Sequence, residues 1–502
     1  MLTSCKSYRL LGTTAHPATV ECEVTTGIGV HIVGLPDSAI NESLLRVVTA
    51  LVSKGYKLPG KKVIVNVAPT LLQETSTVTG LDLPIALSLL TASEQENLPL
   101  LDTFPVAGEL DLEGNVRYIK GAFCMAEKAC HDGAPGIILP QQDAAEVFAT
   151  GLLPESFKIW GIDTLDDALS ILQGARRDDL LAQNTKAYAY LNKVREATIP
   201  GTSAPLLRAT QIAAAGGFDL AIDASQDIIT NTSALLALLL TNTGKETPRQ
   251  RNTRAEQARI WSVADRLGLL VTCPTVPLRR PSKCGHVSIQ SLFGGTRQLL
   301  PGETSLAHGG ILQIDNPEEM PINHRNYVRA VHQEKAVTLN RHKTTVQYPA
   351  DFKLVIAHNN DETSNAKAFR EMTAQSPSVH VTYQGHTLNM HLTKEHLTAI
   401  KMTIDKAVAK QLQRYTNEGF SRNADITAKK LDTYIPLTKE CHDTLERLMA
   451  QMDLLPNATM PIVTIARTIA DLDGCEDVAP AHLAEAAGYQ YLYRKNLWKQ
   501  TA

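Results

Sequence analysis

The sequence predicts an α/β protein of several domains that ends in a mostly helical domain. The chain has 502 residues, which is too long for one compact core. Strand-like and helix-like hydrophobic patterns alternate from the N-terminus to about residue 390, as in α/β folds. From about Thr393 onward, apolar residues recur at helical spacing instead. We therefore expect two α/β units followed by helices.

The first α/β unit is expected to cover residues 1–175. Its hydrophobic patterns predict strands at 20–24, 29–35, 61–69 and 136–140, helices at 43–56, 81–95 and 121–132, and a hairpin at 104–119. Gly133 is well placed to end the last of these helices ahead of its strand. A charged stretch without strand pattern follows and ends in Pro and Gly, which predicts an interdomain linker at 176–205.

The second α/β unit is expected at 206–390 and the helical domain at 391–502. The strands of the second unit are predicted at 218–225, 268–276, 309–316 and 352–359, with a hairpin at 336–348. Helical patterns between several of these strands favour a largely parallel sheet. In the helical domain Leu445, Leu448 and Met452 share one helix face, and Ile462, Ile465 and Ile469 share another.

Composition and charge exclude several classes of protein. With 49 basic and 52 acidic residues the net charge is -3, so the whole chain is not built to coat nucleic acid, and any such role needs a local patch. The eight cysteines form no C-x-x-C pair and no zinc-type spacing with histidine. No apolar run is long enough to cross a bilayer, so we expect a cytoplasmic protein without a membrane partner.

Eight stretches, in order, carry a resemblance to a known family. They are GLPDSAINES, VIVNVAPTLL, LDLPIALSLLTASEQ, VAGELDLEGNVR, IAAAGGFDL, GETSLAHGGILQID, YPADFKLVIAHN and IARTIADLD. Together they span almost the whole chain, which resembles the ComM/YifB family of magnesium-chelatase-like AAA+ proteins. The resemblance implies a Lon-protease-like α/β N-terminal domain, a P-loop-type AAA+ α/β module and a C-terminal helical lid.

The resemblance also implies ATP and Mg²⁺, held by a P-loop directly after the strand at 218–223. That position reads from Ala224 to Asn231 and contains no glycine. Thr230 stands where the lysine would be, and Asn231 replaces the hydroxyl that binds magnesium. Two β-branched residues resist the positive φ angles of such a loop, and Asp227 adds negative charge beside the phosphates. We expect ordinary ATP binding to be lost.

The other nucleotide-site positions of the family are also altered. Asp315 matches the metal-linked carboxylate and is the one candidate metal ligand, but Asn316 occupies the position of the catalytic glutamate. An amide cannot accept a proton from water. Asn359 matches the first sensor, whereas Asn457 replaces the arginine of the lid, and the segment 376–384 shows no arginine finger. We therefore expect no catalytic residue, and a protein that retains the family's architecture without its ATPase activity.

The N-terminal domain gives a similar result when it is compared with Lon. Lon peptidases use a serine that a nearby lysine activates. Phe123 falls at the position of that lysine, and the stretch around Asp82 lacks the serine. We expect no peptidase activity and predict a role in assembly or partner binding.

Two basic features are candidates for contact with nucleic acid. The hairpin at 336–348 carries Arg341 and Lys343 near its tip, where hairpins of related motors point into a ring pore. A second basic group lies in the same domain: Lys245, Arg249, Arg251, Arg254, Arg259, Arg279, Arg280 and Lys283. The alternative for both is an ordinary solvated surface.

Three functions remain open at this point. The first, which we favour, is a non-hydrolysing AAA+ scaffold or regulatory subunit, a homo- or hetero-oligomer linked to DNA processing or natural transformation. The second is an active ATP-dependent DNA helicase or branch-migration motor of the ComM type, which would require ATP turnover despite Thr230 and Asn316. The third is a protein-interaction module that works through its inactive Lon-like domain and shows no salt-sensitive DNA binding.

Overall fold

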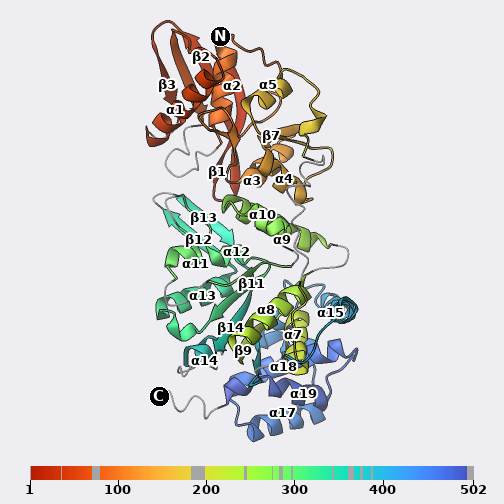
Figure 1. The fold of residues 1–502 in the computed structure, drawn as a ribbon. Coiled ribbons are helices and arrows are strands. Elements are labelled where there is room, and N and C mark those ends of the chain that lie inside the picture. The colour runs from red at the N-terminus through yellow and green to blue at the C-terminus, as the bar shows by residue number, and fades with distance from the viewer. Residues whose placement is uncertain are drawn as a thin grey trace.

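Three units follow one another along the computed structural model, from the N-terminal α/β domain through a middle α/β domain to a helical C-terminal domain (Figure 1). The structure describes residues 2–34, 37–69, 80–182, 198–241, 246–273, 275–281, 287–295, 298–341, 344–359, 367–373, 377–385 and 388–494. Most of the predicted linker lies outside these ranges. The domain boundaries at 175, 205 and 390 stay predictions.

The N-terminal domain is built on a four-stranded mixed sheet of order β1-β2-β4-β3. Strands β1, β2 and β4 are antiparallel neighbours, and β3 runs parallel to β4 at the edge. A parallel pair, β7 and β8, and a hairpin, β5–β6, complete the strands. The strands are β1 (Leu2–Leu11), β2 (Thr14–Thr25), β3 (Gly29–Val33), β4 (Lys62–Ala68), β5 (Glu109–Leu110), β6 (Val116–Arg117), β7 (Gly136–Pro140) and β8 (Lys158–Ile162). The helices are α1 (Asp37–Ser53), α2 (Asp82–Ala92), α3 (Ala122–His131), α4 (Gln141–Ala149) and α5 (Leu165–Leu172).

Strand β1 was missed by the sequence patterns. It alternates exposed and buried positions, but its inward side begins with Thr3, Cys5 and Ser7 rather than with large apolar residues. Arg9, whose side chain is fully buried, follows on the same side. Hydrophobic periodicity cannot detect a strand whose buried face is largely polar.

The middle domain contains a five-stranded parallel sheet of order β10-β11-β14-β9-β15, as the alternating pattern predicted. The predicted hairpin is confirmed as β12–β13. The strands are β9 (Asp219–Ala224), β10 (Leu278–Arg279), β11 (Ile311–Asp315), β12 (Ala336–Arg341), β13 (Thr344–Pro349), β14 (Lys353–Asn359) and β15 (Ser378–Thr382). The helices are α7 (Ala204–Gly216), α8 (Gln226–Leu240), α9 (Pro248–Val263), α10 (Leu267–Val271), α11 (Ile289–Phe293), α12 (Glu303–Leu306), α13 (Ile322–Glu334) and α14 (Lys367–Thr373).

The strand predicted at 268–276 is wrong, because its first residues form the short helix α10. Asp265, with a φ of 59°, turns the chain sharply after α9. Leu267 is then buried against the N-terminal domain. The true edge strand is β10, farther along the chain. A short apolar run does not distinguish a strand from a buried helical turn.

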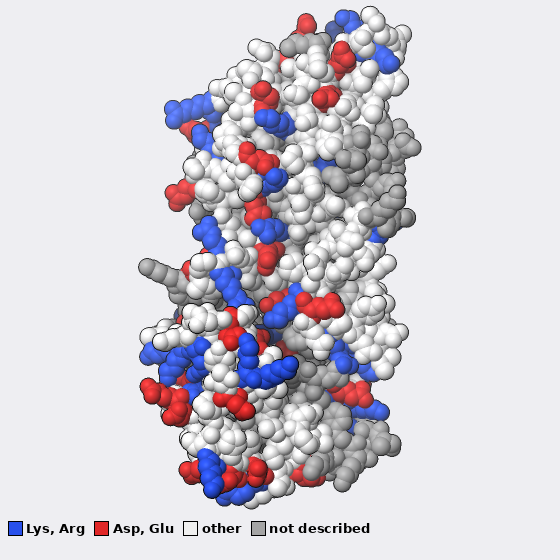
Figure 2. All heavy atoms as spheres, turned by 180° about the vertical axis from the view of Figure 1, so that it is seen from behind, with Lys and Arg blue, Asp and Glu red and all other residues white. Residues whose placement is uncertain are grey.

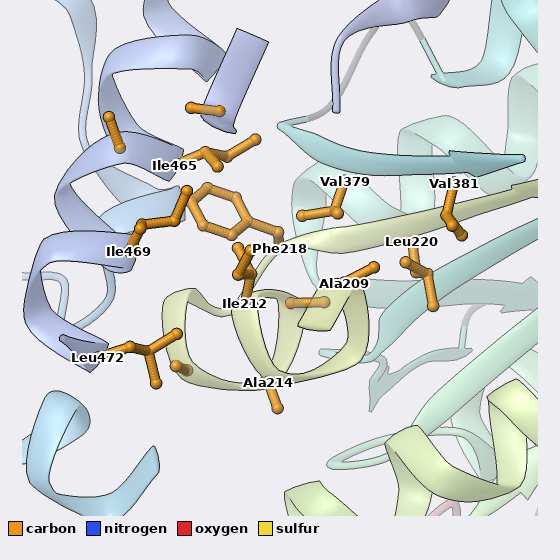
Figure 3. Close-up of a cluster of buried hydrophobic side chains, with 14 of the residues drawn as sticks. Ala209, Ile212, Ala214, Phe218, Leu220, Val379, Val381, Ile465, Ile469 and Leu472 are labelled. Carbon is orange, nitrogen blue, oxygen red and sulfur yellow. The ribbon is translucent and has the colours of Figure 1, made fainter. Parts of the chain in front are cut away.

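The helical C-terminal domain packs against the sheet through one continuous core. Its helices are α15 (Lys394–Arg414), α16 (Leu431–Tyr434), α17 (Lys439–Gln451), α18 (Thr459–Leu472) and α19 (Pro480–Gly488). Thr393 caps α15, and Pro480 begins α19. Figure 3 shows Ile465 and Ile469 of α18 facing Phe218, which lies beside Ile212 of α7. Helix α7 therefore joins the helical domain to the sheet.

A second core joins the N-terminal and middle domains. It combines Leu10 and Phe123 with Trp261, Val346 and Tyr348 in one buried cluster, which we call the interdomain core. Helix α3 lies along α9, and the Phe123 N–H donates to Ser262 Oγ at 3.0 Å. The two domains therefore share a hydrophobic core.

A buried histidine in β15 predicts sensitivity to acid. His380 lies between Ser378, whose Oγ is 2.9 Å from its Nε2, and the stacked ring of Tyr493. Burial lowers the pKa of His380 from 6.5 to about 3. The imidazole is therefore neutral in the folded protein, but it takes up a proton below pH 6.5 when the chain unfolds. The free energy of unfolding that depends on a neutral His380 is fully present above pH 6.5 and is lost as the pH falls toward 3.

We expect His380→Phe to lose less stability in acid than the wild type, by up to about 1.4 kcal/mol for each pH unit below 6.5. Phenylalanine preserves the stacking, and Ser378 Oγ still donates to Thr373 O at 3.3 Å. Urea unfolding of both proteins at neutral and acidic pH measures the difference. Equal acid sensitivity in the two proteins would contradict this assignment.

Among the described residues, no helix has the length and apolar character needed to span a membrane.

Candidate functional site

The candidate site lies at the carboxyl edge of the parallel sheet, where ligands of open α/β sheets bind. Asp315 ends β11, and Asn359 ends β14. Strand β14 lies between β11 and β9, and Asn359 pairs with Ala224 at the end of β9. Thr230 follows on α8, whose first turn begins just beyond β9. These predicted positions therefore lie at the same edge of the sheet.

Only one residue, Ser225, separates β9 from α8. The resemblance implies a loop at residues 224–231, but the structure shows that residues 226–231 are helical. The physical reason is burial: Ile228 and Ile229 are each only 1% exposed and pack in the domain core. Where the resemblance implies a phosphate loop, the chain forms a regular helix.

The polar side chains on this first stretch of α8 bond to their own helix. Thr230 Oγ1 donates to Gln226 O at 2.9 Å, and Asn231 Nδ2 donates to Asp227 O at 2.7 Å. Asp227 lies in the first turn, where its negative charge complements the helix dipole. The N-terminal end of α8, which could otherwise attract an anion, therefore already carries the negative charge of Asp227.

An arginine pairs with the carboxylate at the end of β11. Arg280 Nε donates to Asp315 Oδ2, and its Nη1 lies 3.4 Å from Thr230 Oγ1. Gln313 Nε2 donates to Asp315 Oδ1 at 2.6 Å. Both oxygens of Asp315 therefore have partners within the chain. We refer to Thr230, Arg280, Gln313 and Asp315 as the Arg280 network.

Sequence reasoning missed the role of Arg280 because it placed the edge strand at the wrong residues. Strand β10 ends at Arg279 and pairs in parallel with β11, so Arg280 emerges at the same edge as Asp315. The polar Gln313 within an apolar strand was the available signal. A buried polar side chain needs a hydrogen-bond partner, so Gln313 indicated that another polar or charged group lies close to this strand.

Asn316 links two strands. Its φ of 42° places it in the left-handed region, which asparagine tolerates better than most residues. Its Oδ1 accepts a hydrogen bond from the Asn359 N–H at 2.9 Å. The amide at the position of the family's glutamate thus connects the ends of β11 and β14.

The residues at this edge do not fit a magnesium–ATP complex. A phosphate loop requires glycine amides that open toward the phosphates and a lysine for the outer oxygens. Residues 225–231 supply neither, and Ile229 N–H is already bonded to Ser225 O. Asp315, the one candidate metal ligand, holds an arginine instead. No group of three or more metal-ligating side chains occurs among the described residues.

Asn457 is separate from this group. It is exposed in the short 3-10 helix Pro456–Ala458 that leads into α18. Within the described ranges, no hydrogen bond joins Asn457 to the sheet edge. The structure therefore brings together five of the six predicted nucleotide-site positions.

The basic candidates for nucleic-acid contact are largely paired within the chain. Arg279 donates to both oxygens of Glu303, at 2.6 and 2.8 Å, and lies over the ring of Trp261. Arg341 is half-buried at the end of β12, and Lys343 lies outside the described residues. Their contact with nucleic acid stays a prediction.

Three of the four arginines of α9 contact the N-terminal domain, whereas Arg249 donates to Ser421 Oγ. Arg251 donates to Leu152 O, Arg254 donates to Thr150 O, and Arg259 pairs with both oxygens of Glu127 at 2.6 and 2.8 Å. On the face shown in Figure 2, basic and acidic side chains are interspersed over much of the molecule. Arg251, Arg254 and Arg259 therefore help to hold the middle domain against the N-terminal domain.

The N-terminal domain places a buried phenylalanine where the resemblance implies a lysine. Phe123 is fully buried in the interdomain core. Asp82 is 2% exposed and accepts hydrogen bonds from Ser43 Oγ at 2.5 Å and from Arg46 Nε at 2.6 Å. Ser43 donates to this carboxylate, so the contact does not pair a serine with a base of the Lon type.

Comparison with known proteins agrees with these domains. The family models for "Subunit ChlI of Mg-chelatase", "Magnesium chelatase, subunit ChlI" and "Magnesium chelatase, subunit ChlI C-terminal" match residues 20–143, 199–404 and 394–490. The chain is 29% identical to uncharacterized protein YifB of Salmonella typhimurium over 511 residues, covering 96% of each. It is 27% identical to competence protein ComM of Haemophilus influenzae over 516 residues, again covering 96% of each.

A partial match concerns the Lon-like fold. The chain is 29% identical to the archaeal Lon protease of Thermococcus kodakarensis over 118 residues, which are 23% of this chain and 19% of that protein. The architecture is thus a Lon-protease-like domain, a magnesium-chelatase-type AAA+ module and a helical lid. The chain belongs to the family of magnesium-chelatase-like AAA+ proteins that includes YifB and ComM.

Proposed function

We propose that this protein is a non-hydrolysing AAA+ scaffold or regulatory subunit. The observation that carries the proposal is the first turn of α8, which occupies the place of a phosphate loop and carries Asp227. The asparagine at position 316 supports it, because an amide cannot act as the base that activates water. A nucleotide would meet negative charge at the point where a motor offers amides and a cation.

The role in the cell is proposed from the relatives. The name of the Haemophilus protein associates it with competence, and we extend this to a role in DNA processing or natural transformation in the cytoplasm. AAA+ modules work as rings, so we propose that the chain assembles with copies of itself or with an active relative. In such an assembly it would contribute shape and contacts instead of ATP turnover.

An ATPase assay tests the absence of hydrolysis. Phosphate release by the purified wild type, with magnesium and with or without DNA, is expected to equal that of Asp315→Asn. The Asn variant removes the one carboxylate of the site that could hold a metal, so activity common to both comes from a contaminating enzyme. Turnover in the wild type that disappears in Asp315→Asn would instead establish the active motor.

DNA binding through the hairpin tip predicts a specific salt dependence. The double variant Arg341→Ala/Lys343→Ala is expected to bind fluorescent single-stranded DNA more weakly than the wild type. Its plot of log affinity against log salt is expected to be less steep by about 0.7 for each phosphate that the variant no longer neutralises. Fluorescence anisotropy at several salt concentrations measures both quantities. Arg176→Ala is the control, since this 89% exposed side chain lies outside the middle domain, at the start of the predicted linker.

A second candidate function is a protein-interaction module. It is favoured by large apolar side chains on the surface of the Lon-like domain: Ile28, just before the edge strand β3, is 89% exposed, Val33 at the end of β3 is 50% exposed, and Leu45 on α1 is 66% exposed. Leu45→Asp tests it, because loss of self-association in sedimentation experiments would place the protein contact on this domain. Unchanged assembly would exclude that surface.

A further inference from the structure

The Arg280 network joins three elements that meet at the sheet edge. Arg280 follows β10, Asp315 ends β11, and Thr230 lies in the second turn of α8. The guanidinium contacts both of the other two side chains, and Gln313 holds the remaining oxygen of Asp315.

Electrostatics explains why a cation is needed here. The Asp315 side chain is only 18% exposed, so its charge has lost most of its hydration. The position is also the one to which the resemblance assigns a carboxylate that meets magnesium. Without a metal, the carboxylate requires another positive partner, and a fixed arginine supplies both charge and directed donors.

We propose that Arg280 is a built-in counter-cation, which neutralises Asp315 from within the chain and thereby holds β10, β11 and α8 in one nucleotide-independent arrangement. This inference rests on the proposed function, because it assumes that no magnesium–ATP complex competes for Asp315. It goes further than that function because it identifies Arg280 as the group that takes the place of the nucleotide at this edge of the sheet. The domain would then keep one conformation at any ATP concentration.

A double-mutant cycle on the full-length protein tests the pairing. The four proteins are the wild type, Arg280→Ala, Asp315→Asn and the double variant, each unfolded in urea. Arg280→Ala is expected to lower the equilibrium constant for folding about tenfold, because it leaves Asp315 without its cation. The double variant is expected to be no less stable than Arg280→Ala, since the uncompensated charge is then absent.

Two further variants sharpen the result. Arg280→Lys keeps the charge but not the fork of donors, so its stability is expected to lie between those of the wild type and Arg280→Ala. Arg176→Ala removes an arginine whose ion pair with Asp178 is far more exposed, and is expected to have no measurable effect. If the effects of Arg280→Ala and Asp315→Asn simply add, the two side chains do not interact and the proposal is overturned.

Adding magnesium and ATP to the same unfolding experiments separates this inference from the function on which it rests. Neither the wild type nor Arg280→Ala is expected to be stabilised. Stabilisation of the wild type by the nucleotide would refute the nucleotide-independent scaffold, whatever the cycle shows. A clear coupling energy with no nucleotide effect supports both.

Discussion

Replacing Asp471 by alanine is expected to destabilise the helical domain by about 3–5 kcal/mol, the typical cost of removing one partner of a buried ion pair. The Asp471 carboxylate is completely buried on α18. It accepts hydrogen bonds from Arg414 at 2.6 Å and from Arg467 at 3.0 Å, and Asn423 donates to its other oxygen. Its loss leaves two guanidinium groups in the core with no carboxylate between them.

Hydrogen exchange of the α18 amides measures this effect locally. An unfolding free energy lower by about 3–5 kcal/mol makes exchange roughly a hundredfold to several thousandfold faster. The matched control is Asp473→Ala, two residues away, because Asp473 is 40% exposed and pairs with Arg208 at the surface. Its effect is expected to stay below about 1 kcal/mol. If hydrogen exchange becomes faster by the same factor in both variants, the buried ion pair contributes no more to stability than the exposed one.

The second large effect is expected at the interdomain core. Phe123→Ala removes a fully buried ring and should cost about 3–5 kcal/mol. Because the ring packs between α3 and the middle domain, much of this energy comes from the packing between the two domains. The Lon-like domain is then expected to separate from the AAA+ module more often.

Limited proteolysis reports this separation, because cleavage follows the population of the open form when opening and closing are fast. Phe123→Ala is expected to be cut at least about a hundredfold faster than the wild type near α3 and α9. Tyr118→Ala, at a position 53% exposed in the same domain, is the control and should change the rate little. A Phe123→Ala variant as resistant as the wild type would mean that the interdomain core does not hold the domains together.

Much of the fold could be predicted because apolar patterns determine it. The parallel strands β9, β11 and β14 are runs of buried apolar residues, and the faces of α17 and α18 followed helical periodicity. The elements that were missed lack such patterns. Strand β1 buries small polar residues and an arginine, and β10 has only two residues.

The candidate site was only partly predictable. Motif order placed Asp315, Asn316 and Asn359 at one edge, since the ends of neighbouring parallel strands must meet there. That residues 226–231 form a helix depended on the burial of Ile228 and Ile229 in the three-dimensional core. The pairing of Arg280 with Asp315 joins residues 35 positions apart, and no local pattern encodes such a contact.

The partners of the basic residues could not be predicted from the sequence. A run of arginines in the sequence suggested a surface for nucleic acid, and four of them have carboxylates or carbonyls of this same chain as partners: Arg251, Arg254, Arg259 and Arg279. Charge counts along a sequence cannot show whether a positive side chain is already paired.

Calorimetric titration of the wild type with ATP and magnesium tests the central claim most directly. A helix with Asp227 in its first turn, beside a carboxylate already bound to Arg280, is predicted to give no binding heat even at millimolar ATP. A saturating titration with a micromolar dissociation constant would contradict that prediction and restore the chain to the nucleotide-driven members of its family.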